Sequence, residues 1–190
     1  MIEKRLNRFK LVNFCKVVDI SLQKEIFIER GIITLGTSVV NKDDFYVIDA
    51  KDCIVAPGFI DPQINGLDKC DFWTITGLPY DKGFAQIDSL RLKLASCGVV
   101  AFCPTIITAP KEKIIKSIDY INTYIQQADP TCGARILGIH LEGIFITKFG
   151  VHDSKYAQSE FTVESVSPFV KILLLYQFYL VQEQYWKVQE

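Results

Sequence analysis

Short apolar runs separated by turn residues fill the first 56 residues of the chain. The runs are rich in Val, Ile, Phe and Tyr, and Gly31, Gly36 and the polar cluster 41–44 lie between them. Apolar runs of this length that are bounded by turn residues are typical of β-strands. The pattern therefore predicts a small antiparallel sheet, with strands at residues 10–18, 25–28, 32–35, 45–48 and 53–55.

The pattern changes at Ala56-Pro57-Gly58, after which strand-like and helix-like segments alternate. Such alternation is typical of βα units that build a parallel sheet. The expected strands are 58–65, 99–105 and 135–141, and the expected helices are 82–97 and the segment from Pro110 to about Gln127. Each helix has one apolar face, which in the first carries Ile87, Leu90 and Leu94 and in the second Ile114, Ile118, Ile121 and Ile125.

The length of this second region limits its architecture. Of 190 residues, 190 minus 56, or 134, follow the first β region. At about 30 residues for each βαβ step they make about four units, whereas a complete (β/α)₈ barrel takes about 250 residues. The sequence therefore predicts an α/β fold that is either a small open sheet or part of a larger barrel.

Composition and charge exclude several classes of protein. With 49% hydrophobic and 23% charged residues the chain is expected to fold, and its interspersed charges, with a net charge of -1, predict neither a nucleic-acid partner nor a membrane surface. The longest apolar run, 172–181, is shorter than the roughly 20 residues of a membrane span. The six cysteines form no Cys-x-x-Cys pair, which favours reduced thiols and a cytoplasmic location.

Polar side chains line two of the expected parallel strands. Alternation along a strand places Asp61, Gln63 and Asn65 on one face, and it places His140 and Glu142 together on another. Buried parallel strands are normally apolar on both faces, so these rows indicate a lined pocket at the carboxyl ends of the strands. The alternative is that the same groups are hydrogen-bonded within the core or cap the strand ends.

Glu142 is the sharpest candidate, because it ends a strand directly before Gly143. Catalytic and metal-binding residues of parallel α/β proteins commonly occupy this position, and the sequence His140-x-Glu142 is suited to a metal ion. A structural carboxylate and a buried core histidine are the alternatives. His152 lies in a polar loop beside Gly150, where it can meet a ligand or simply face solvent.

Three motifs occur in the order that one enzyme family shows. They are Ala56-Pro-Gly-Phe-Ile-Asp-Pro-Gln-Ile-Asn-Gly66, Gly98-Val-Val-Ala-Phe-Cys-Pro-Thr105 and Gly138-Ile-His-Leu-Glu-Gly143. Over roughly residues 8–170 the chain resembles the N-acetylglucosamine-6-phosphate deacetylases of the amidohydrolase superfamily. The pair Gln63-x-Asn65 is the most specific part, because most amidohydrolases carry His-x-His at this place.

The resemblance implies a fold and a domain organisation. Residues 1–56 would form an N-terminal β-sandwich-like segment, and residues 57–174 would form about half of a TIM-like barrel. Residues 175–190 have no counterpart in the family and form a divergent tail. The resemblance also allows a homodimer.

It further implies a reaction, the hydrolysis of N-acetylglucosamine 6-phosphate to glucosamine 6-phosphate and acetate with a divalent metal cation such as zinc. Glu142 matches the metal-binding glutamate of the family, and Val151 and His152 match its substrate-contacting pair. Gln63, Asn65 and His140 are expected to line the pocket. The family's other metal ligands and its catalytic aspartate match no residue here, so no catalytic residue is assigned.

Departures from the family pattern leave three hypotheses. Ile144 and Asp153 replace two prolines of the family motifs. The first hypothesis is that the chain is part of a deacetylase. The second is that it is a catalytically inactive fragment or isoform of that enzyme, and the third is that it is an independent small α/β binding protein.

Overall fold

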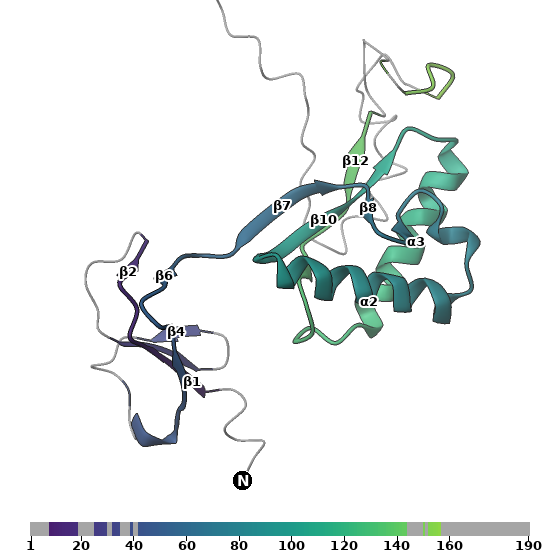
Figure 1. Ribbon diagram of the computed structural model, residues 1–190. Helices are drawn as coiled ribbons and strands as arrows, with labels where there is room; N and C mark the ends of the chain where they lie inside the picture. Colours follow the sequence, from purple (N-terminus) through teal and green to yellow (C-terminus); the bar gives the residue numbers. More distant parts are fainter. Residues whose placement is uncertain are drawn as a thin grey trace, which may run out of the picture. The chain divides into compact units, whose positions relative to one another are not determined.

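The structure is a computed structural model, and it describes residues 8–18, 25–29, 32–34, 39, 42–143, 150 and 152–156. The chain divides into two compact units, with the division between Pro57 and Gly58 (Figure 1). The divergent tail 175–190 lies outside the described residues. Within these residues, no helix combines the length and the apolar character that crossing a bilayer requires.

The first unit contains a four-stranded sheet in the order β4-β3-β1-β5. Antiparallel pairing joins β1 to β3 and β3 to β4. Phe27 of β3 is fully buried against Phe45, with the rings edge to face and their centroids 5.1 Å apart. The strands are β1 (Arg8–Val12), β2 (Lys16–Val17), β3 (Glu25–Glu29), β4 (Ile32–Thr34), β5 (Tyr46–Asp49) and β6 (Ile54–Val55).

The prediction that this sheet is purely antiparallel was wrong. β1 pairs with β5 in parallel, and the short strand β2 pairs in parallel with β6. Antiparallel strands can be joined by a tight turn, whereas the connection from β4 to β5 is long and includes the 3-10 helix η2 (Lys42–Asp44). The chain therefore has enough length to return and enter beside β1 in the same direction.

The second unit contains three parallel neighbours, in which β10 (Val99–Ile107) lies between β7 (Phe59–Ile64) and the pair of short strands β11 (Arg135–Ile136) and β12 (His140–Glu142). A small antiparallel hairpin of β8 (Gly66–Leu67) and β9 (Cys70–Asp71) follows β7. The α/β class, with a parallel sheet after an N-terminal β unit, is confirmed. The half barrel stays a prediction.

Two helices pack next to each other beside this sheet (Figure 1). They are α2 (Tyr80–Ser96), which follows the 3-10 helix η3 (Ile75–Gly77), and α3 (Lys111–Gln127). The predicted apolar faces are confirmed as the core, because Ile87 and Leu90 of α2 and Ile118 and Ile121 of α3 are at most 2% exposed. Gly98, with a φ of 84°, ends the α2 segment in a conformation that favours glycine.

The third predicted strand is divided in two. β10 advances from Phe102 to Thr105, three residues, while its partner advances from Ile136 to His140, four residues. This side of the sheet therefore has one residue more than β10 between the two pairings, and residues 137–139, which belong to no strand, separate β11 from β12. Alternation holds within β12, so His140 and Glu142 share a face as expected.

Alternation along β7 is interrupted at Pro62. The register with β10 shifts between Phe102 and Pro104, where Asp61 and Ile64 of β7 are the neighbouring partners. Proline has no N–H and cannot donate to the ladder, which explains a shift at this point. The predicted polar row of Asp61, Gln63 and Asn65 is therefore not continuous along the strand.

Candidate functional site

The carboxyl ends of the parallel strands carry the candidate site. Glu142 is the last residue of β12, Asn65 directly follows β7, and Thr108 directly follows β10. Parallel strands end at the same edge of their sheet, so these three residues from distant segments meet there. The side chains of Asn65, Thr108, Glu142 and His152 form a connected group, which we call the Glu142 cluster.

Asn65 and Glu142 are joined directly. The side-chain amide of Asn65 donates from Nδ2 to Oε2 of Glu142 over 3.1 Å. The Glu142 side chain is 25% exposed, so the bond forms at a partly solvated position. It fixes one carboxylate oxygen and leaves the other, Oε1, directed toward His152.

His152 faces that second oxygen. Its Nε2 lies 3.8 Å from Oε1 of Glu142, and its side chain is 16% exposed. The other ring nitrogen, Nδ1, lies 3.0 Å from Oγ1 of Thr108. The imidazole is thus held between a carboxylate and a hydroxyl group, although His152 and Glu142 come from different segments of the chain.

Thr108 links the group to the backbone. Its hydroxyl group donates to the carbonyl oxygen of Gly143 over 2.6 Å and lies 3.3 Å from that of Glu142. The sequence pattern does not single out Thr108, which lies between the predicted strand 99–105 and the helix expected from Pro110. A threonine at the end of a predicted parallel strand was the available signal, because functional side chains are common at that place.

Gly143 permits the close approach of the two side chains. Its φ is 77°, and a Cβ atom at this position would lie 2.6 Å from both Nδ1 of His152 and Oγ1 of Thr108. Neither distance is acceptable for a carbon atom. Glycine is therefore required after Glu142 both for the backbone conformation and for the space.

The other predicted pocket residues lie differently. His140 is 7% exposed, and its Nδ1 lies 3.2 Å from Oγ1 of Thr105 on the neighbouring strand. Gln63 is exposed, and its backbone N–H donates to the Asp61 side chain over 3.0 Å. Among Gln63, Asn65, His140 and Glu142, the structure joins Asn65 and Glu142 directly. The pocket-lining roles of Gln63 and His140 stay predictions.

Two predicted roles are not tested by these positions. Val151 lies outside the described residues, so its substrate contact stays a prediction. Among the residues that the structure describes, no three His, Cys, Asp or Glu side chains are grouped so that they could hold a metal ion. Glu142 is the one ligand that the resemblance assigns, and a metal site at this edge needs about two more protein ligands.

A second polar group follows the β8–β9 hairpin. The side chain of Asp71 accepts from the backbone N–H of Trp73 over 2.8 Å, and the Lys113 ammonium lies 3.2 Å from the centre of the Trp73 ring. Burial lowers the pKa of Lys113, and the nearby Asp71 carboxylate acts in the opposite direction. Lys113 is therefore a cation held over an aromatic face in the first turn of α3.

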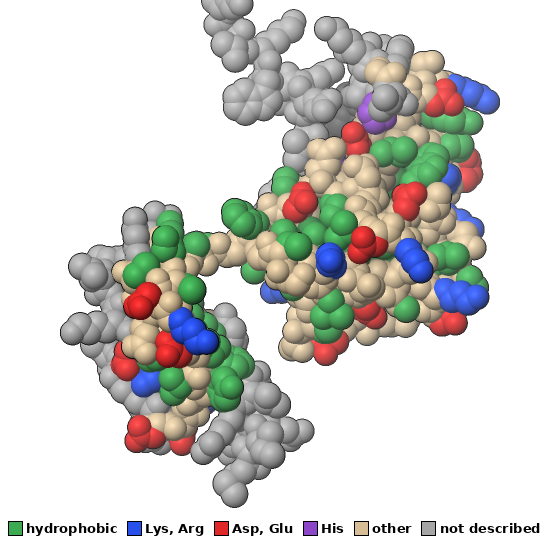
Figure 2. Space-filling view, in the orientation of Figure 1, with side chains coloured by type: hydrophobic (Ala, Val, Ile, Leu, Met, Phe, Trp, Pro, Cys, Tyr) green, Lys and Arg blue, Asp and Glu red, His purple; other side chains and the backbone are tan. Residues whose placement is uncertain are grey.

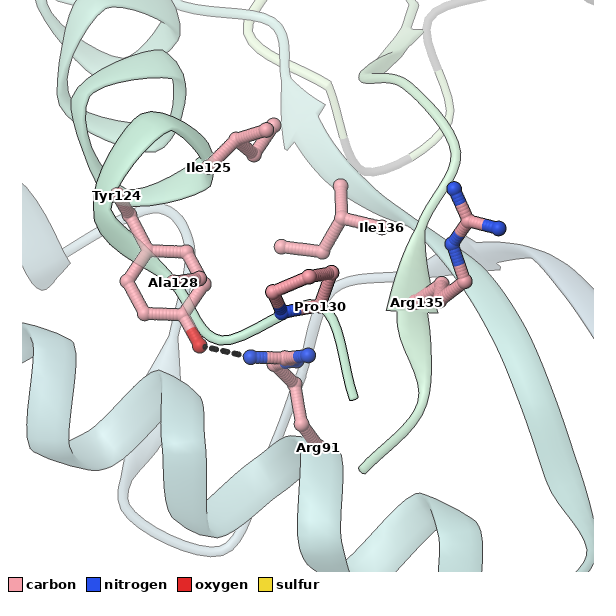
Figure 3. Close-up of a pocket in the computed structure, with 7 residues that line it drawn as sticks. All are labelled: Arg91, Tyr124, Ile125, Ala128, Pro130, Arg135 and Ile136. Atoms are coloured by element: carbon pink, nitrogen blue, oxygen red, sulfur yellow. Dashed lines mark hydrogen bonds between the residues drawn. The ribbon is translucent and has the colours of Figure 1, made fainter. Parts of the chain in front are cut away.

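A distinct small pocket lies between the end of α3 and β11 (Figure 3). Its volume of about 110 Å³ is well below the roughly 300 Å³ or more of typical ligand pockets. Arg91 lines it but is already engaged: it donates to the carbonyl oxygens of Ala134 and Asp129 and to the Tyr124 hydroxyl group. The Glu142 cluster shares no residue with this pocket, and we interpret Arg91 as structural.

Acidic and basic side chains are mixed on the visible surface. On the face shown in Figure 2, acidic and basic side chains are interspersed over both units. The predictions of no nucleic-acid and no membrane partner are not tested by this view and stay predictions.

Comparison with known proteins relates the chain to one enzyme. A search against protein-family models gives no match. The chain is 35% identical over 143 residues to the N-acetylglucosamine-6-phosphate deacetylase of Rattus norvegicus and 34% identical over 143 residues to that of Homo sapiens. Each match covers 73% of this chain and 33% of the relative. The chain thus spans about a third of the length of these curated relatives.

Solved structures of the same enzyme share the fold. The deacetylase from Pasteurella multocida aligns with a TM-score of 0.65 at 22% identity, over 87% of this chain and 42% of that one. A D267A mutant from Mycobacterium smegmatis, in complex with N-acetyl-D-glucosamine-6-phosphate, aligns with a TM-score of 0.59 at 18% identity, over 88% of this chain and 40% of that one. The resemblance that the three motifs predict is therefore confirmed: this chain is similar in sequence and in fold to a portion of the N-acetylglucosamine-6-phosphate deacetylases.

Proposed function

We propose that this chain provides part of the active site of an enzyme that hydrolyses N-acetylglucosamine 6-phosphate to glucosamine 6-phosphate and acetate. The observation that carries the proposal is the position of Glu142, which is held at the carboxyl edge of the parallel sheet between Asn65 and His152. Sequence similarity to curated deacetylases over 73% of the chain supports it independently. The same similarity favours this reading over an independent small α/β binding protein.

The reaction breaks the C–N bond of an acetamide. The oxygen of a water molecule adds to the acetyl carbon, and the sugar nitrogen leaves as an amine after it gains a proton. A bound divalent cation would supply a water of lowered pKa and would polarise the amide carbonyl group. In this chain Glu142 is the residue proposed to hold such a cation, and the further ligands that it needs have to come from outside the described residues.

His152 is proposed to contact the substrate. Its Nε2 is directed at the same edge as the Glu142 carboxylate, so a sugar bound at this edge would meet both side chains. Val151, its neighbour in the chain, is proposed as the second contact. Asn65 would keep the Glu142 carboxylate in place by occupying one of its oxygens.

The larger architecture is also part of the proposal. We infer that the parallel strands β7, β10 and β12 are the first strands of a TIM-like barrel, because the chain shares its fold with less than half of each solved deacetylase compared above.

The six cysteines are all free thiols, which supports a reducing, cytoplasmic location.

An acetate-release assay on two proteins tests the function. The purified 190-residue chain, supplied with zinc, cobalt or manganese, is expected to release no acetate, because the described residues do not bring together three metal-binding side chains. A chimera in which residues 1–156 replace the matching segment of the rat deacetylase is expected to release acetate with added metal.

Two variants of the chimera provide the comparison. Glu142→Gln removes the proposed ligand charge and is expected to lower the rate by at least about 100-fold, whereas Asp119→Asn, on the exposed side of α3, should leave it unchanged. A folded chimera that releases acetate equally well with Glu142→Gln would contradict the assignment. Acetate release by the isolated 190-residue chain would contradict the proposal that the chain provides only part of the active site.

A further inference from the structure

We infer that Thr108 is a positioning residue that fixes the tautomer and the direction of the His152 ring. The inference rests on the proposed function only for its consequence, because the hydrogen bonds themselves are independent of any reaction. Thr108 is 5% exposed, and its Oγ1 lies within 3.3 Å of three polar atoms. These atoms are the carbonyl oxygens of Glu142 and Gly143 and Nδ1 of His152.

The tautomer follows from counting hydrogen atoms. A threonine hydroxyl group has one hydrogen to donate and two lone pairs to accept with. Carbonyl oxygens only accept, and the 2.6 Å distance to the Gly143 carbonyl makes this the bond that takes the hydroxyl hydrogen. The lone pairs of Oγ1 then face Nδ1 of His152 at 3.0 Å, so Nδ1 must carry the proton and donate it.

The neutral ring is then left with a free lone pair on Nε2. This nitrogen is 3.8 Å from Oε1 of Glu142, which is too long for a hydrogen bond, so the carboxylate does not require a proton on Nε2. Nε2 lies at the edge where the substrate is proposed to bind. A lone pair there accepts a hydrogen bond from an O–H or N–H group of a sugar, whereas the opposite tautomer would donate one. Thr108 thereby decides which kind of substrate group His152 recognises.

The backbone around Glu142 reinforces this arrangement. Because Thr108 binds the carbonyl groups of both Glu142 and Gly143, the residue that holds the ring also holds the strand end that carries the carboxylate. The glycine at 143 leaves the space in which Oγ1 and Nδ1 approach each other. A displacement of the strand end at Glu142 would therefore also displace the His152 ring, because Thr108 is bonded to both.

Nitrogen NMR on the 190-residue chain tests the inference directly. The chain has two histidines, so ¹⁵N-histidine labelling gives four ring nitrogen signals, and long-range ¹H–¹⁵N correlations report which nitrogen of each neutral ring is protonated. We expect His152 to be protonated at Nδ1 and unprotonated at Nε2. Protonation at Nε2 in the neutral wild-type ring would overturn the inference.

Variants at two threonines separate positioning from general stability. Thr108→Val keeps the shape but removes the hydroxyl group, so the His152 signals should move toward an equal mixture of tautomers, and Thr108→Ser should restore them. Thr105→Val is the matched control, because Thr105 contacts Nδ1 of His140 and should move the His140 signals alone. If Thr108→Val leaves the His152 tautomer unchanged while the His140 signals show a folded chain, Thr108 does not position the ring.

The NMR test of the His152 tautomer can fail or succeed independently of the acetate-release assay that tests the proposed function. The tautomer is read without substrate, metal or turnover, so a chimera that fails to release acetate leaves the NMR result standing. In an active chimera, Thr108→Val is expected to lower kcat/KM by about 10- to 100-fold, the usual effect of removing a partner that orients a functional group. Thr108→Ser should recover most of that loss.

Discussion

Asn65 donates a hydrogen bond from Nδ2 to Oε2 of Glu142 over 3.1 Å and so joins the end of β7 to the end of β12. The two residues are 77 positions apart in the sequence. β10 pairs with both β7 and β12 and lies between them, so this hydrogen bond links the two strands on either side of β10. An amide at position 65 complements the Glu142 carboxylate because it donates a hydrogen and carries no charge of its own.

A carboxylate at position 65 should therefore disturb Glu142. In Asn65→Asp the hydrogen bond would be lost and two acidic groups would lie about 3 Å apart, where like charges repel each other. We expect this variant to lower the free energy of unfolding at pH 7 by about 1 to 2 kcal/mol in urea denaturation. Gln63→Glu is the matched control and should change it by less than about 0.5 kcal/mol, since Gln63 is exposed in β7 and its backbone, rather than its side chain, makes the hydrogen bond described there. Equal effects of the two substitutions would mean that the hydrogen bond does not form in solution.

The buried guanidinium of Arg91 is expected to be essential for stability. Arg91 is 3% exposed and joins α2 to the end of α3 and to the residue before β11 through three hydrogen bonds. Arg91→Met would leave two carbonyl groups and the Tyr124 hydroxyl group without this donor, which should lower the free energy of unfolding by about 3 to 5 kcal/mol. Urea denaturation measures the change, and Lys93→Met on the exposed face of the same helix should change it by less than about 0.5 kcal/mol.

Periodicity was a sound guide to the helices but not to the pairing of the strands. The isoleucines of α3 recur at helical spacing, and burial of that face is a local consequence of the pattern. The parallel pairing of β1 with β5 depends on the course of a long connection, which no local pattern encodes. The same limit applies to β7, where Pro62 breaks the alternation that placed Gln63 beside Asn65.

The candidate site was predicted where a single strand end carried the signal. Glu142 was identified from its position before Gly143, and Asn65 from the end of the first predicted parallel strand, 58–65. Thr108 was missed, because its role depends on hydrogen bonds to residues 142, 143 and 152, which the fold brings together. Tertiary contacts of this kind require the register of β10 with β12, and composition and spacing do not supply it.

Gly83, in the second turn of α2, should not tolerate alanine. Alanine normally stabilises a helix interior by about 1 kcal/mol relative to glycine. Here a Cβ atom would lie 2.0 Å from the hydroxyl oxygen of Tyr120, whose ring is buried. We expect Gly83→Ala to lower the free energy of unfolding by about 1 to 3 kcal/mol, which overpacking of a filled site typically costs.

Gly77 provides the comparison for that substitution. A Cβ atom at Gly77 would meet nothing within 4 Å. Gly77→Ala should therefore change the stability by less than about 0.5 kcal/mol. Equal effects of the two substitutions in urea denaturation would show that Tyr120 moves aside without cost.

The stability of the chain should fall in alkaline solution, in part because of Cys70. Burial raises the pKa of this thiol from 9.0 to about 12, and the neighbouring Asp71 carboxylate acts in the same direction. Above pH 9 the unfolded chain releases the thiol proton while the folded chain keeps it, so the unfolded state binds fewer protons and is favoured as the pH rises. For this one group the loss of stability is about 1.4 kcal/mol per pH unit between about pH 9 and 12.

Urea denaturation of the wild type and of Cys70→Ala at pH 7 to 11 measures this loss of stability. The variant is expected to be less stable at pH 7, because it loses a buried side chain, but its stability should fall less steeply above pH 9. Parallel curves for the two proteins would mean that the thiol is not buried in the folded state.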